Sequence, residues 1–199
     1  GAIDLADTAG LVWVFGREGS NSRFGFISSK SWQEGESGNP DPVLLEEYVY
    51  ENFSRSINGG EAILYRPISK TVNRYPNGTA EVTTSDPAQS ASDLAIATIT
   101  NENPEVPASE NGSDAPTTRT LYLRDDGTRQ FELAEDGVVT YFEYTNGQLT
   151  KRIDDADDDQ SRDFDGTPPT TNAAAVHRIT TYTYDAQGRP DTETQADGR

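Results

Sequence analysis

Glycine-containing turns recur at a fixed spacing in the last third of the chain. Gly127, Gly137 and Gly147 stand ten residues apart, and Gly188 and Gly198 have the same separation. Each period has room for one strand and one turn. Turn dipeptides of the same class occur at Asn58-Gly59, Asn77-Gly78, Asp126-Gly127, Asp136-Gly137, Asn146-Gly147 and Asp197-Gly198. So many tight reversals predict an all-β fold, an antiparallel meander of β-hairpins, and leave little place for helices.

Aromatic residues alternate along the segments before these turns. Tyr182 and Tyr184 are two positions apart, so they share one face of an extended strand. Phe142 and Tyr144 hold the same places forty residues earlier, before an Asn-Gly pair that is typical of a type I′ turn. We interpret these aromatics as structural, because cross-strand aromatic pairs contribute roughly 0.2–1 kcal/mol each. An exposed aromatic row that stacks on a glycan is the alternative.

The stretch from Tyr182 to Gly198 resembles the hairpin of the YD-repeat, or RHS-repeat, proteins, which has a Tyr-x-Tyr-Asp core, a Gly-Arg turn and a trailing Asp-Gly. Tyr48-Val-Tyr50-Glu51 is a weaker copy with Glu for Asp. The residues that carry the resemblance are Tyr48, Tyr50, Phe142, Tyr144, Gly147, Tyr182, Tyr184, Asp185, Gly188 and Gly198. The resemblance implies a secreted or cell-surface protein whose hairpins build the β-sheet wall of a shell or fibre. Its partners would be other segments or copies of the same protein, joined by strand pairing.

Composition divides the chain into three parts. Residues 1–84 are predicted to form hairpins that diverge from the repeat, and residues 120–199 to form the repeat hairpins. Residues 85–119, rich in Ser, Ala, Asn, Pro and Glu, predict a polar excursion around a short apolar strand at 94–99. A second, acidic insertion spans 154–176. Because repeat arrays carry insertions in loops, we expect the sheet to remain intact when this segment is removed.

At two places in residues 1–84 the sequence allows more than one backbone conformation. Asp41 is a good helix cap and Pro42 suits a first helical turn, so a helix could begin here. The alternation of Tyr48 and Tyr50 instead predicts a strand, and we favour the strand. Pro67 lies within the next apolar run, where it should occupy an edge or a β-bulge.

The charge of the chain excludes several classes of partner. There are 34 acidic and 16 basic residues, which gives a formal net charge of −18. Phosphate recognition depends on Lys and Arg, so nucleic acid and anionic membranes are not expected partners. No apolar run approaches the length of a membrane-spanning helix, and without cysteine there is no disulfide framework. The acid-rich, lysine-poor composition fits salty surroundings or an extracellular surface, and we expect an extracellular or cell-surface location.

The acidic insertion contains the one candidate site. Calcium is the predicted ligand, because a hard cation needs several converging oxygens. The candidate ligands are Asp155, Asp157, Asp159, Asp163 and Asp165. Gln160 stands where calcium loops have glycine, so a solvated acidic loop is the alternative. His177 is the only histidine, and we interpret it as structural or exposed. No catalytic residue and no cofactor besides calcium are predicted.

Overall fold

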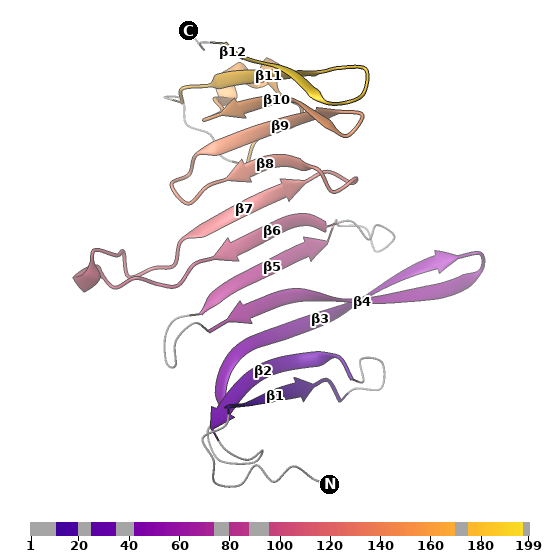
Figure 1. Cartoon of the computed structure of the whole chain (residues 1–199), viewed down its shortest axis with the longest axis vertical. Helices are drawn as coiled ribbons and strands as arrows, with labels where there is room; N and C mark the ends of the chain where they lie inside the picture. Colours follow the sequence, from indigo (N-terminus) through magenta and orange to yellow (C-terminus); the bar gives the residue numbers. More distant parts are fainter. Residues whose placement is uncertain are drawn as a thin grey trace. The chain divides into compact units, whose positions relative to one another are not determined.

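The computed structural model describes residues 11–19, 25–34, 42–73, 80–87, 96–169 and 175–196. Twelve antiparallel strands form one sheet, and their order in the sheet follows their order in the sequence (Figure 1). The predicted all-β meander is therefore confirmed. The chain divides into two compact units: unit 1 contains residues 1–85 and 101–117, and unit 2 contains residues 86–100 and 118–199. No helix in the described ranges has the length and hydrophobicity needed to cross a membrane.

The sheet contains short and long strands. They are β1 (Leu11–Arg17), β2 (Ile27–Glu34), β3 (Val43–Ile57), β4 (Gly60–Val72), β5 (Glu81–Pro87), β6 (Ile96–Glu102), β7 (Thr118–Leu123), β8 (Arg129–Leu133), β9 (Val139–Thr145), β10 (Gln148–Asp154), β11 (Arg178–Tyr184) and β12 (Pro190–Ala196). Two 3₁₀ segments, η1 (Ala108–Glu110) and η2 (Asp158–Asp163), complete the secondary structure. The strand favoured after Pro42 is thus observed as β3.

The longest hairpin of unit 1 joins β3 and β4. Its turn residues Asn58 and Gly59 have φ values of 51° and 81°, the two positive values that a type I′ turn requires. The pairing register shifts where Tyr50 faces Pro67, because proline cannot donate to the ladder. Of the two positions predicted for Pro67, an edge or a bulge, the structure shows a bulge next to it.

Residues 85–119, predicted as a polar excursion around a short apolar strand, contain the end of β5, one whole strand and the start of another. Residues 96–102 form the complete strand β6, and β7 begins at Thr118. In the described part of this stretch, the connection between β6 and β7, which contains η1, lies outside the strands. The first residues of the predicted apolar strand, Leu94 and Ala95, lie outside the described residues.

The buried core of unit 2 lies on one face of β8, β9 and β10. Phe131 faces Tyr141 across β8 and β9, and Tyr141 faces Ile153 across β9 and β10, so the three side chains share that face. Tyr141 and Ile153 are both 0% exposed. Val139, Ala156 and Phe164 complete the cluster.

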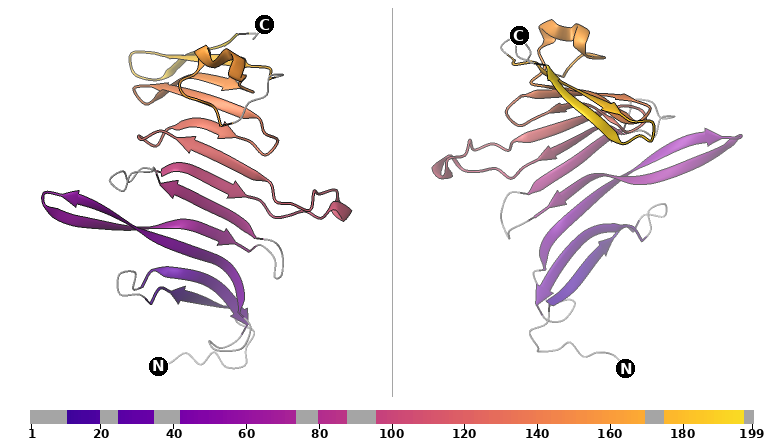
Figure 2. Two further views of the ribbon diagram at one scale, coloured as in Figure 1. Left: turned by 180° about the vertical axis from the view of Figure 1, so that it is seen from behind. Right: turned by 45° about the horizontal axis from the view of Figure 1, so that its top comes forward.

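The acidic insertion covers this core. Figure 2 shows the segment that contains η2 lying against one face of the C-terminal strands. The ring of Phe164 lies 6.0 Å from that of Phe131 and 5.6 Å from that of Tyr141, between centroids. The backbone N–H of Ala156 donates to the carbonyl of Val139 at 2.8 Å. The expectation that the segment is dispensable is therefore revised, because removal would expose the apolar face that it covers.

Candidate functional site

Two tyrosines of the repeat-like strands bond to the backbone of the preceding strand. The hydroxyl of Tyr50, on β3, donates to the carbonyl of Ile27 on β2 at 2.9 Å. The hydroxyl of Tyr184, on β11, donates to the carbonyl of Leu149 on β10 at 2.9 Å. Tyr50 and Tyr184, each the second aromatic residue of its pair, thus occupy equivalent positions and each ties two strands together. These side chains are part of the sheet rather than free to stack on a ligand.

Tyr48 belongs to a charged cluster on the sheet of unit 1. Its hydroxyl donates to the carboxylate of Glu46, and this bond, with burial next, raises the pKa of Tyr48 to about 12. The same bond is the main cause that lowers the pKa of Glu46, and Lys70 and Lys30 lower it further against the opposing effect of burial. The ammonium groups of Lys30 and Lys70 lie 3.8 and 3.7 Å from the Glu46 carboxylate.

The Asp and Arg of the YD-like turn hold its backbone. The Oδ1 atom of Asp185 accepts the N–H groups of Gln187 and Arg189, each at 2.9 Å, and Oδ2 accepts the Nε–H of Arg189 at 2.7 Å. These bonds, those to Arg189 first, hold the pKa of Asp185 below its ordinary range. Gly188 provides the positive φ of 78° that closes the turn. The Asp, Gly and Arg of the Tyr-Asp-x-x-Gly-Arg sequence therefore all stabilise the same turn.

Two further turns use the same backbone bonds. The N–H of Arg124 donates to the carbonyl of Thr128, as that of Ala134 does to Val138 and that of Asp185 to Arg189. In all three turns only the glycine has positive φ, which is the geometry of a type I turn followed by a bulge. The Asn146-Gly147 turn differs, with φ of 53° and 78°, and is the predicted type I′ turn.

The remaining repeat residues lie within the sheet. Phe142 and Tyr144 are half-buried on β9, and Tyr182 is half-buried on β11. Thr183, between Tyr182 and Tyr184, is exposed and bonds to Thr192 of β12 at 2.6 Å, hydroxyl to hydroxyl. This alternation agrees with the predicted shared face of the two tyrosines. Gly198 lies outside the described residues, as does the Asn77-Gly78 turn.

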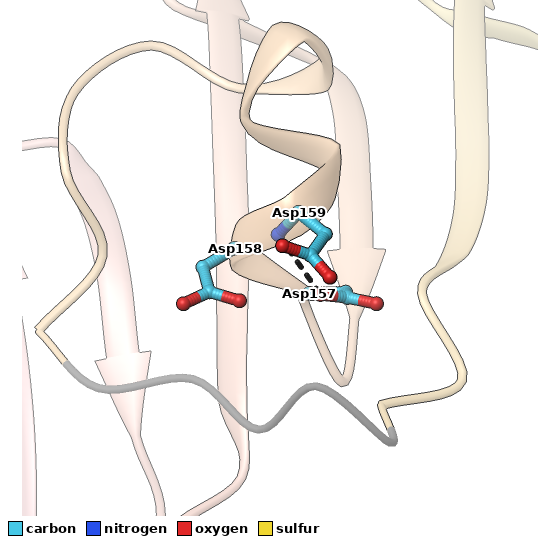
Figure 3. Close-up of side chains that lie close together, drawn as sticks. All are labelled: Asp157, Asp158 and Asp159. Carbon is cyan, nitrogen blue, oxygen red and sulfur yellow. Dashed lines mark hydrogen bonds between the residues drawn. The ribbon is translucent and has the colours of Figure 1, made fainter.

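The structure brings two of the five candidate calcium ligands together. Ligand atoms of Asp157, Asp158 and Asp159 lie within 4.8 Å of one another at the start of η2 (Figure 3). One carboxylate oxygen of Asp157 already accepts the N–H of Asp159 at 3.0 Å, the dashed line in Figure 3. Asp158, which is not among the five predicted ligands, is the third member.

The other three candidates make different contacts. The carboxylate of Asp155 accepts the N–H of Val176 at 2.8 Å, and that of Asp163 lies 3.1 Å from the Nε2 atom of His177. The backbone N–H of Asp165 donates to the hydroxyl oxygen of Tyr141 at 2.9 Å. The contacts of Asp155 and Asp163 close the base of the segment, and that of Asp165 fastens it to β9, so the five aspartates do not converge on one point.

His177 closes the base of the acidic segment. It is 8% exposed, and its Nδ1 atom accepts the N–H of Asp157 at 3.0 Å. Nε2 therefore carries the proton and donates to Asp163. The N–H of His177 itself donates to the carbonyl of Asp155 at 2.8 Å, and both residues have positive φ. The structural interpretation of this histidine agrees with these contacts.

Two aromatic side chains on the first strand are exposed. Trp13 is 50% exposed and Phe15 is 45% exposed, and they lie on the same face of β1. The ammonium group of Lys30 lies 5.1 Å from the centre of the Trp13 ring. These two side chains give β1 an exposed aromatic face.

Models of known protein families and curated proteins were compared with this chain, and none of them matches it.

Proposed function

We propose that this chain is a structural, non-catalytic segment of a YD-repeat-like protein of the cell surface or the extracellular space. In this proposal its hairpins form the wall of a shell or fibre, and they pair with other segments or copies of the same protein. The observation that carries the proposal is the use of the repeat residues inside the sheet. Tyr50 and Tyr184 tie neighbouring strands, and Asp185 holds the turn.

The open ends of the meander support this function. Within the described ranges, β1 pairs with β2 and β12 pairs with β11, so each terminal strand has one neighbour in the sheet. A terminal strand presents N–H and C=O groups that another strand can bind. The exposed acidic side chains keep such a sheet soluble until a specific partner pairs with it.

Electron microscopy of the chain in a buffer of high salt, with and without a calcium chelator, tests the proposal. We expect ordered assemblies, from paired copies to filaments or shells, that form without any added ligand and that survive chelation. Dispersed small particles whose tryptophan fluorescence changes with a neutral saccharide would contradict the proposal and favour a glycan-binding module.

A further inference from the structure

We propose that β1 is the pairing edge of this sheet, and that its partner is β1 of a second copy of the chain, bound antiparallel about a twofold axis at Val14. The inference rests on the proposed function for the idea that sheet edges pair. It adds the identity of the edge, the partner and the register.

The two terminal strands differ in how well they are protected against pairing. β12 begins with Pro190 and carries Asp191 and Glu193, and all seven of its residues are exposed. Proline and charged side chains are the usual protection of an edge strand. β1 has the sequence LVWVFGR, in which Arg17, at the end, is the only charged residue. An edge of this composition, with two exposed aromatics, is the one that a partner strand would cover.

The sequence of β1 is complementary to itself. The pairing with β2 is regular from Leu11 to Gly16, and the register shifts after Gly16. A twofold axis at Val14 places Val12 opposite Gly16 of the second copy and Trp13 opposite Phe15. The two residues of each opposite pair then have numbers that are both even or both odd. Alternate residues of β1 direct their N–H and C=O groups away from β2, so in this register such residues of the two copies face each other and form a regular antiparallel ladder.

The side chains on the exposed face also fit this register. Trp13 faces Trp32 on β2, and Phe15 faces Lys30. In the dimer, a row across the interface reads Trp32, Trp13, then Phe15 and Lys30 of the second copy. Cross-strand aromatic pairs of this kind stabilise a sheet, and no like charges face each other. Pairing of two β12 strands would instead bring Asp191 and Glu193 of both copies into one small area.

Analytical ultracentrifugation of charge variants tests the inference. We expect the unsubstituted chain to dimerise more tightly as salt rises, because the net charge of −18 is screened. The double variant W13K/F15K places lysines opposite each other and should raise the dimer Kd by about 100-fold or more. The variant W13E/F15E, measured by itself, should show the same rise in dimer Kd, because it places glutamates opposite each other. A mixture of the two variants should form a one-to-one heterodimer, which also proves that both are folded.

The control is T192K/T194K, which changes exposed positions of β12 and should leave the dimer Kd unaltered. Assembly that persists in W13K/F15K and is lost in the β12 variant would overturn the β1 dimer but leave the wall function in place. A chain that stays monomeric at every concentration, or mixed variants that do not combine, would also overturn the β1 dimer. A monomer whose fluorescence responds to a neutral saccharide would overturn the proposed function as well.

Discussion

Substitution of Phe164 by alanine should destabilise unit 2. The side chain is 8% exposed and packs on Phe131 and Tyr141, so the change removes a buried ring and leaves a cavity. Phe→Ala changes in protein cores cost about 3–5 kcal/mol. Because the covering segment can settle into part of the space, we expect a loss near the lower end, about 3 kcal/mol of the free energy of unfolding.

Urea unfolding measured by far-UV circular dichroism checks this value. A loss of about 3 kcal/mol lowers the midpoint by about 1–3 M for a unit of this size. Both tryptophans, Trp13 and Trp32, belong to unit 1, so their fluorescence follows unit 1 in the same experiment. Val176→Ala is the matched control in the same segment, because Val176 is 65% exposed, and it should change stability by less than about 0.5 kcal/mol. Equal, small effects of the two substitutions would refute the view that the acidic segment covers the core.

Three further predictions concern a turn, a hydroxyl and the aspartate cluster. Gly147→Ala should lower the stability by about 1 kcal/mol, because φ is 78° and an added Cβ meets nothing within 4 Å, so only the backbone conformation is strained. Gly19→Ala is the control: it is equally unhindered but lacks the positive φ, and it should leave the thermal unfolding temperature unchanged. Since the pKa of Tyr48 is raised from 10.0 to about 12, the stability that this shift contributes is complete below pH 10 and is lost as the pH rises to 12. Unfolding monitored by tryptophan fluorescence should show this loss of stability in the unsubstituted chain and not in Tyr48→Phe. Calorimetry on chelator-treated chain should give heat with calcium at about millimolar concentration, which Asp157→Asn with Asp159→Asn removes; a titration without heat would refute the calcium prediction.

The fold was predictable from the turns, because they are local. The Asn146-Gly147 pair needs only its own two residues to reverse the chain, and the alternation of Tyr182 and Tyr184 needs only the pleat of one strand. The Asp-Gly turns were predicted as reversals, but the type I geometry with a bulge depends on the residues around each dipeptide. Pro67 shows the same locality, since its missing N–H restricts it to an edge or a bulge in any sheet.

The covering role of the acidic segment could not be predicted, because it depends on contacts distant in sequence. Phe164 is the only aromatic residue of the acidic segment, and its place on Phe131 and Tyr141 depends on the strand register. The alternate aspartates suggested one calcium loop. In the structure Asp155 and Asp163 bond to the base of the segment, through Val176 and His177. Spacing in the sequence does not distinguish an oxygen that binds metal from one that accepts a backbone N–H.

Hydrogen–deuterium exchange of β1 tests most directly whether this sheet functions through its edges. Alternate amides of β1 point away from β2, and we expect them to exchange with solvent in the isolated chain. We predict that these amides become protected as the concentration of the chain rises, while the exposed strand β12 keeps its exchange rate. Amide exchange rates of β1 that are the same at every concentration, and in every particle that forms, would contradict the claim that this sheet functions through its edges.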